Sequence, residues 1–173
     1  LWNPAFEHDS CGVGLVVDIA GRPSREIVAR ALAGLVNLTH RGGVGADSRT
    51  GDGAGVLTQV PIAIFADALA AAGHADVGPG ELGVAMVFLP PDEEQRHACE
   101  QMLEEAIREE GQIVIGWRDV PCDDTGIGAS ARATQPVFRM LFVARDGLQG
   151  LALDRYAYVA RRDFTKFLGL TSV

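Results

Sequence analysis

The chain has 173 residues, 47% of them hydrophobic, which is enough for one globular domain with a single core. A formal charge of −8 at pH 7 without a basic cluster argues against nucleic acid as a partner and favours a small-molecule substrate. We expect a cytoplasmic protein with neither a membrane span nor a metal site, because no apolar run is long enough to cross a bilayer and the three cysteines lack metal-ligand spacing.

The first part of the chain alternates apolar and helical patterns. An apolar strand is predicted from Cys11 to Ile19, followed by a turn at Ala20–Pro23. Ser24 is typical of a helix N-cap. The helix that follows is predicted to cover the sheet of the first strand with one apolar face, formed by Ile27, Val28, Ala31, Leu32, Leu35 and Val36. A second strand is predicted at Val56–Val60, beside the first, and an alanine-rich helix at Ile62–Ala72.

The middle of the chain predicts a loop, a strand and a long helix. Glycines and a proline place a loop at Gly73–Gly80, before an apolar strand at Leu82–Leu89. Prolines and the acids Asp92–Glu94 predict the start of a helix, which Gly111 ends. Its buried stripe is predicted to comprise Ala98, Cys99, Met102, Leu103, Ala106 and Ile107, which gives Cys99 a structural role.

The last part of the chain predicts two further strands, at Ile113–Val120 and Val137–Ala144. Between them, Pro121–Pro136 resembles a solvated loop more than a metal or phosphate loop, because its two adjacent acids lack the alternating ligands of a calcium site. A closing helix is predicted over Gly150–Phe167, with a solvated basic end at Arg161, Arg162 and Lys166.

Cys11 is the strongest chemical candidate, because its thiol stands beside glycines at the head of a predicted strand. Cleavage between Ser10 and Cys11 would place a free α-amino group on the same residue as the sulfur. That amine titrates near neutrality, at about pH 8, so it can act as the general base for the thiol. The alternative is that Cys11 is a small buried strand residue.

A glycine-rich segment follows the first helix and contains Asp47 and Asp52. It does not match a phosphate-binding loop, because no lysine followed by serine or threonine is present and its glycines precede a predicted strand. Carboxylates in such turns mostly accept backbone hydrogen bonds, so both acids are expected to shape the loop rather than to act as general acids.

Three stretches together resemble a known family. DSCGVGLVVDIAG, LVNLTHRGGVGAD and TGDGAGVLTQVP, in this order, are similar to the start of the glutamate synthase large subunit, whose amidotransferase domain is a class II, N-terminal-nucleophile glutaminase. The similarity is strong from Phe6 to Phe65 and fainter as far as Arg162, after which no clear correspondence remains. It implies an α/β (α+β) fold that is part of a four-layer αββα sandwich with antiparallel sheets.

The resemblance also implies roles for particular residues. Residues 1–10 would be a propeptide-like leader cleaved between Ser10 and Cys11, and residues 11–173 the N-terminal part of the amidotransferase domain. Cys11 would attack the side-chain amide of glutamine, giving a thioester and ammonia. Arg41 and Gly42 would support the nucleophile. The active-site loop would include Gly12, Asp47, Asp52 and Gly53.

Two family motifs are missing from this chain: the Asn-Gly pair of the oxyanion hole and the His-Thr-Arg motif that binds the glutamine carboxylate. We therefore expect a fragment of a longer protein with very weak glutaminase activity alone, since an oxyanion hole contributes several kcal/mol. The resemblance places flavin mononucleotide and an iron–sulfur cluster in the parent protein, with no cofactor in this fragment. Expected partners are glutamine, the rest of the chain, and a small electron-transfer subunit or ferredoxin; a plant-type parent would be plastid-located.

Two rival readings use the same residues. In one, His40 activates Cys11 as in an ordinary cysteine hydrolase, without cleavage of the leader. The position of His40, however, is also typical of a structural histidine at a helix C-terminus, and we prefer this interpretation. In the other rival, the chain is a catalytically dead interaction module that keeps the fold but not the reaction.

Overall fold

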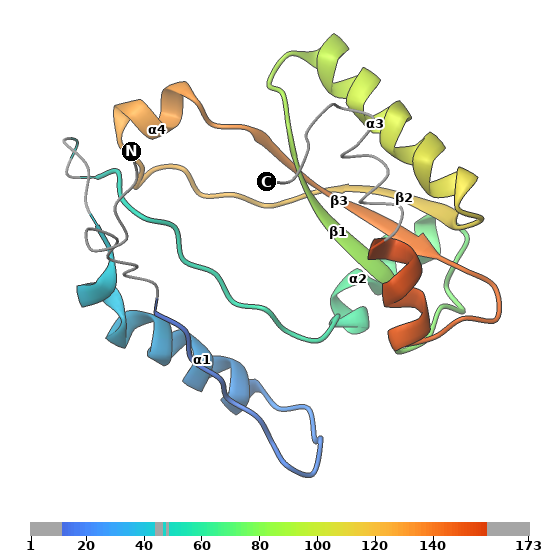
Figure 1. Ribbon diagram of the computed structural model, residues 1–173, viewed down its shortest axis with the longest axis horizontal. Helices are drawn as coiled ribbons and strands as arrows, with labels where there is room; N and C mark the ends of the chain where they lie inside the picture. Colours follow the sequence, from blue (N-terminus) through green and yellow to red (C-terminus); the bar gives the residue numbers. More distant parts are fainter. Residues whose placement is uncertain (1–11, 44–46, 48, 159–173) are drawn as a thin grey trace, which may run out of the picture. The chain divides into compact units, whose positions relative to one another are not determined.

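The computed structural model describes residues 12–43, 47 and 49–158 of the chain (Figure 1). The chain forms two compact units, one from Leu1–Thr58 and Asp123–Thr134, the other from Gln59–Cys122 and Gln135–Val173. The buried hydrophobic residues of the described part all belong to the second unit. In the described ranges, no helix combines the length and the apolar character needed to cross a membrane.

The described residues of the first unit include helical elements but no strand of the sheet. The helical elements are the helix α1 (Arg25–Asn37), the 3₁₀ turn η2 (Thr39–Arg41) and the helix α4 (Ala129–Ala133). The predicted cap of α1 is confirmed, because Ser24 Oγ accepts a hydrogen bond of 3.3 Å from the backbone N–H of Ile27. The predicted solvated loop Pro121–Pro136 is only partly right, since α4 lies within it.

Both strands predicted for the N-terminal part are wrong over the residues that the structure describes. The backbone of residues 12–18 and of Val56–Val60 belongs to no strand. The alternating apolar side chains Val13 and Ile19 are 92% and 101% exposed. An apolar run becomes a strand only when another strand satisfies its backbone groups, and neither run is part of the sheet that the described residues form.

The apolar face of α1 is consequently not covered as predicted. None of the helix residues is buried, and Val28, Leu32 and Val36 form an exposed stripe at i, i+4 and i+8. Ile27, Ala31 and Leu35 are half-buried on the neighbouring side of the helix. The helical spacing was therefore predicted correctly, whereas the sheet that α1 was expected to cover is absent from the described residues.

The second unit is built on an antiparallel sheet of three strands, and its predicted strands are confirmed. The strands are β1 (Gly83–Leu89), β2 (Ile113–Asp119) and β3 (Val137–Ala144), in the spatial order β1-β3-β2. The central strand β3 pairs with both neighbours, Leu141 lying opposite Ala85 of β1 and Trp117 of β2. Helices α2 (Ile62–Ala71) and α3 (Glu93–Glu109) are also close to their predicted bounds.

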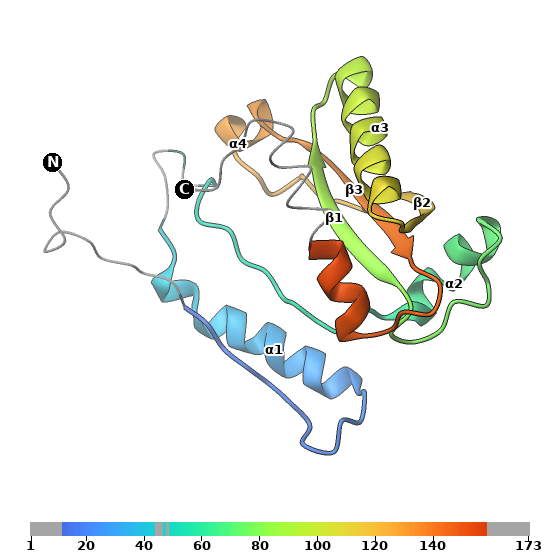
Figure 2. The same cartoon turned by 45° about the vertical axis from the view of Figure 1, so that its right-hand side comes forward.

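Consecutive residues of β3 point to opposite faces of the sheet and so divide the core into two clusters. Phe142 packs with Phe65 and Leu69 of α2 on one face; the two phenylalanine rings are 5.0 Å apart. Leu141 and Val143 pack with Leu103 and Ile107 of α3 on the other face. Figures 1 and 2 show α3 running along this second face. Each face of the sheet is thus packed against one helix.

A bulge in β2 decides where Trp117 points. Between Val114 and Gly116 the pairing with β3 shifts by one residue, and Gly116 has a φ of 156°. Val114 and Trp117 are an odd number of residues apart, so in a regular strand they would face opposite sides. The bulge brings both onto the face that carries α3.

The predicted buried stripe of α3 needs a correction. Leu103 and Ile107 are buried, but Ala98 is exposed and Cys99 only half-buried. Glu100, a charged residue, is buried instead, at 8% exposure. Arg139 of β3 explains this, because its Nη1 donates a hydrogen bond of 2.5 Å to Glu100 Oε1.

The closing helix is confirmed over residues 151–158, where the description ends. Leu153 on it is almost fully buried, and Gln112 Nε2 donates a hydrogen bond of 2.9 Å to the backbone oxygen of Tyr156. The predicted continuation to Phe167, including the basic residues Arg161, Arg162 and Lys166, lies outside the described residues.

Candidate functional site

The predicted nucleophile and its cleavage site, Ser10 and Cys11, lie outside the described residues, as does the predicted leader 1–10. Gly12, the neighbour of Cys11, is described and packs against Leu38. A Cβ atom at Gly12 would lie 2.9 Å from Leu38 Cδ2, closer than real Cβ atoms come to another carbon. The residue after the candidate nucleophile therefore lies against the end of α1, and a side chain there would require the Leu38 side chain to move.

The end of α1 also delivers Arg41 and Gly42. Leu38 caps α1, and η2 continues the chain through hydrogen bonds from Arg41 N–H to Leu38 O (2.8 Å) and from Gly42 N–H to Thr39 O (3.1 Å). Arg41 is exposed, and its guanidinium has no hydrogen-bond or ion-pair partner in the described ranges. The structure thus brings Gly12, Arg41 and Gly42 to one end of one helix.

His40 is anchored in the same turn. Its Nδ1 lies 2.9 Å from the backbone oxygen of Asn37, the last residue of α1. A contact to a terminal carbonyl oxygen is what the structural reading of this histidine predicts.

Asp52 closes the base of the glycine-rich loop. Its Oδ2 accepts a hydrogen bond of 2.6 Å from Gly43 N–H, while its own N–H donates to Gly43 O at 3.0 Å. This side-chain carboxylate accepts a backbone hydrogen bond, as the turn chemistry predicted for both acids. Gly53, also predicted for the loop, is exposed, and a Cβ atom at this position would meet open space.

Asp47 ties the same loop to a distant segment. Oδ1 accepts from Arg49 N–H at 3.1 Å, and Oδ2 accepts from the hydroxyls of Thr50 (3.2 Å) and Ser130 (3.3 Å). These hydrogen bonds, with that of the Arg49 backbone the largest, hold the pKa of Asp47 below the ordinary carboxyl value. The Asp47 side chain therefore stays ionised at neutral pH.

Gly128, on the distant segment, is fitted to this contact. Its N–H donates to Arg49 O at 3.2 Å, and a Cβ at this position would overlap the carboxylate of Asp47 and the hydroxyl of Thr50. Sequence reasoning missed Gly128 and Ser130. No local signal marks them, since Ser130 is 83 residues away from Asp47 in the chain.

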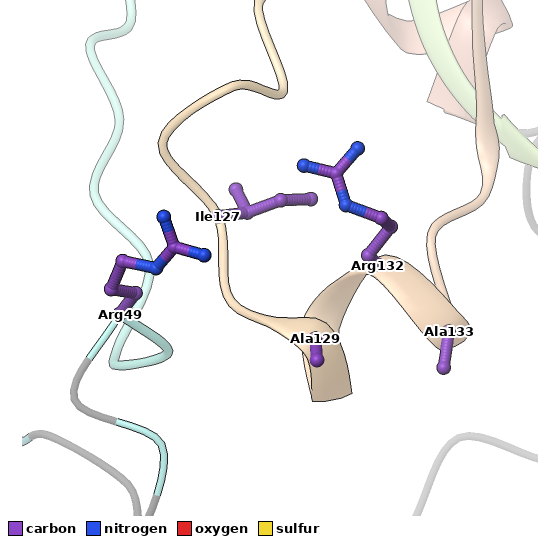
Figure 3. A pocket seen from close by; sticks show the side chains of 5 residues that line it. All are labelled: Arg49, Ile127, Ala129, Arg132 and Ala133. Carbon is purple, nitrogen blue, oxygen red and sulfur yellow. The ribbon is translucent and has the colours of Figure 1, made fainter.

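A pocket of about 370 Å³ lies beside this contact, within the first unit (Figure 3). Its wall combines Arg49 from the loop with residues of the distant segment, namely Ile127, Ala129, Arg132 and Ala133. Arg132 is paired with Asp124, donating to its Oδ2 at 3.1 Å and to its backbone oxygen at 2.8 Å. In the described ranges the guanidinium of Arg49 has no such partner, so it supplies the unpaired positive charge of the pocket.

Comparison with known proteins gives a consistent picture. The family "Glutamine amidotransferases class-II" matches residues 11–172, which extends beyond Arg162, the last position where similarity was recognised from motifs. The chain is 39% identical to the "Glutamate synthase [NADPH] large chain" of Bacillus subtilis, over 94% of this chain and 11% of that protein. It is 38% identical to "Ferredoxin-dependent glutamate synthase 2" of Synechocystis, over 90% of this chain and 10% of that protein.

The chain thus spans about a tenth of the length of these relatives, and the same holds for the large chain from Azospirillum brasilense (36% identity, 95% of this chain, 11% of that protein). The family match covers nearly the whole of the chain and begins at Cys11. This chain belongs to the class II glutamine amidotransferase family.

Proposed function

We propose that this chain is the nucleophile-bearing part of the glutaminase domain of a glutamate synthase. The observation that carries the proposal is the family match over residues 11–172, together with relatives that are glutamate synthases. We further propose that residues 1–10 are a leader and that the domain begins at Cys11, where the family match also begins.

In the proposed reaction the Cys11 α-amine takes the thiol proton, and the thiolate attacks the side-chain carbonyl carbon of glutamine. The protonated α-amine of Cys11 gives the proton to the leaving nitrogen as the carbon–nitrogen bond breaks. Ammonia departs, and a thioester between Cys11 and the substrate remains. Water then attacks this thioester with the amine again as base, which releases glutamate and restores the thiol. The step needs no oxidant or reductant.

Arg41 and Gly42 hold the nucleophilic residue in place in this proposal. The support is geometric: Gly12 packs on Leu38, and Leu38 accepts the hydrogen bond that fixes Arg41. A guanidinium without a described partner at this turn is available to a group on Cys11. The Asp52–Gly43 bridge holds the chain directly after Gly42.

The finer fold assignment is also part of the proposal: the chain contributes to a four-layer αββα sandwich. The described sheet is antiparallel, with helices on its two faces. The first unit leaves the apolar stripe of α1 and the apolar run from Val13 to Ile19 exposed. Both are suited to burial against further layers of the same domain.

The wider reaction is proposed for the longer protein, where ammonia from glutamine would meet 2-oxoglutarate and electrons to form a second glutamate. The names of the relatives point to NADPH in one case and ferredoxin in another as the source of electrons. The flavin mononucleotide and iron–sulfur cluster would lie in other parts of that protein. In the described ranges, no group of three or more His, Cys, Asp or Glu side chains is arranged to hold a metal ion.

The proposal is tested by intact mass measurement of the protein with and without a diazo-ketone analogue of glutamine. We expect loss of the mass of residues 1–10 and a single adduct, which Cys11→Ala abolishes. Cys122→Ala is the matched control, because Cys122 is also a free and exposed thiol. An adduct that survives Cys11→Ala but disappears with Cys122→Ala would refute the assignment of the nucleophile.

The same experiment separates the rivals. An adduct on Cys11 in a chain that still carries residues 1–10, lost in His40→Ala, would favour the cysteine hydrolase activated by His40. Absence of any Cys11-dependent adduct, both in this chain and in the longer protein, would favour the inactive interaction module.

A further inference from the structure

Asp47 has more hydrogen-bond partners than shaping its own turn requires. Two of them, Arg49 N–H and the Thr50 hydroxyl, are local. The other partner residue, Ser130, comes from α4 and donates its hydroxyl to Asp47 Oδ2 at 3.3 Å. The carboxylate therefore joins its own turn to a helix 83 residues away in the chain.

A second, independent contact joins the same two segments. Gly128 N–H donates to Arg49 O, and the absence of a side chain on Gly128 leaves room for Asp47 and Thr50. The wall of the pocket in Figure 3 is likewise shared, with Arg49 on one segment and α4 on the other. Contacts from backbone, side chain and pocket wall therefore converge on one junction.

The loop is fixed at two points as a result. Asp52 closes its base through Gly43, next to Gly42, and Asp47 holds its middle against residues 123–134. The Asp47 carboxylate is committed to accepting hydrogen bonds, so it has no proton to donate at neutral pH. A structural attachment beside the candidate nucleophile-supporting residues explains all of these contacts.

We infer that Asp47 is a positioning residue for the glutaminase reaction, which clamps residues 123–134 to the loop that follows Arg41 and Gly42. The inference rests on the proposed function, because it assigns a role in that reaction. Without the clamp, Asp52 and its bridge to Gly43 become the only described attachment of the loop, so Arg41 and Gly42, next to that bridge, are positioned less firmly. Misplacement by about 1 Å in such a site lowers a rate by roughly a hundredfold.

The test compares Asp47→Ala, Asp47→Asn and Ser130→Ala in the active protein, with Asp67→Ala as the matched control. Asp67 is an exposed carboxylate on α2, in the second unit. We expect Asp47→Ala to lower kcat about 10- to 100-fold with little change in KM, because positioning and not uniform binding is lost. Ser130→Ala removes one neutral hydroxyl donor and leaves the local partners of Asp47 in place, so it is expected to lower kcat only about 2- to 5-fold.

Non-additivity gives the sharper readout. Ser130→Ala should cost nothing further when Asp47 is already alanine, because the contact it would remove is gone. Asp47→Asn keeps one acceptor oxygen and should retain an intermediate rate. If Asp47 were a general acid, the results would differ: Asp47→Asn would be as inactive as Asp47→Ala, and Ser130→Ala would have no effect. The Asp47 variants would also lose one limb of the pH–rate profile. These results would overturn the inference.

Hydrogen exchange keeps the inference separate from the proposed function. Amides of Ala129–Ala133 should exchange at least about tenfold faster in Asp47→Ala than in the wild-type protein or in Asp67→Ala. If these amides are unaffected, the clamp does not exist, whatever the activity. If they respond but the wild-type protein forms no adduct at Cys11, the proposed function fails while the clamp stands.

Discussion

Replacing Glu100 is the most direct way to test how α3 is attached to the sheet. Glu100 is buried at 8% exposure and accepts a hydrogen bond of 2.5 Å from Arg139 Nη1. The Arg139 guanidinium also stacks over the Trp117 ring at 5.3 Å, and its Nε forms an ion pair with Asp119 Oδ1 at 2.9 Å without hydrogen-bond geometry. Glu100→Ala would remove the only buried acceptor among these described contacts of Arg139 and leave the exposed Asp119 as the remaining anionic partner of its guanidinium.

The magnitude follows from how deeply the pair is buried. Removing one partner of a fully buried ion pair costs about 3–5 kcal/mol. The Arg139 side chain is 22% exposed and keeps the exposed Asp119 as a partner, so the loss is smaller. We expect Glu100→Ala to lower the free energy of unfolding by about 1.5–3 kcal/mol, the range for hydrogen bonds to charged groups.

Urea unfolding followed by Trp117 fluorescence measures this loss, in a Trp2→Phe background so that one tryptophan reports. Glu105→Ala, an exposed glutamate on the same helix, is the matched control and should change stability by less than about 0.5 kcal/mol. Glu100→Leu combined with Arg139→Met should return to within about 1 kcal/mol of the wild-type protein, because no buried charge then lacks a partner. Equal, small losses for Glu100→Ala and Glu105→Ala would refute the reasoning.

Two further predictions concern the core and the clamp. Leu141→Ala should lower the free energy of unfolding by about 3–5 kcal/mol in the same urea assay, because the Leu141 side chain is fully buried. Leu57→Ala is the control, because Leu57 is fully exposed, and similar losses for both variants would contradict the assigned core. Hydrogen bonds lower the pKa of Asp47 in the folded protein, so the stability that the clamp contributes is complete above the ordinary carboxyl pKa of about 3.9 and is lost as the pH falls through the lowered value. The amide chemical shift of Ser130 should follow this acid titration in the wild-type protein and no longer do so in Asp47→Asn. A titration midpoint above the ordinary carboxyl pKa would contradict the predicted direction of the shift. A titration that persists in Asp47→Asn would belong to another group such as Asp123, whose pKa is also lowered by hydrogen bonds from Thr125.

Local chemistry made several elements predictable. Ser24 and Asp92 each accept a hydrogen bond from a backbone N–H of the helix they precede. This cap depends only on residues within one helical turn, so it can be predicted from the local sequence. Gly111, with a φ of +69°, ends α3 as its position indicated. The strand Val137–Ala144 has the predicted bounds, because its apolar run is delimited by a proline before it and polar residues after it. The three family motifs were likewise readable from sequence alone.

Pairing and burial depend on residues far away in the chain, and here sequence reasoning failed. Residues 12–19 have the alternation of a strand, yet they are not part of the sheet that the described residues form. From the sequence alone, Glu100 is expected to be solvated, because its partner Arg139 is 39 residues away in the chain. The bulge that turns Trp117 toward α3 is set by the register with β3.

The candidate site divides in the same way. The sequence by itself determined the family, the candidate nucleophile Cys11 and the turn that carries Arg41 and Gly42, because these follow from residue types at short spacing. Only the tertiary structure decided that Asp47 reaches Ser130 and that Gly128 must lack a side chain, since both depend on two segments meeting in space. Caps, turns and periodicity act within a few residues, whereas the contacts that hold a site together join residues whose separation in the chain carries no signal.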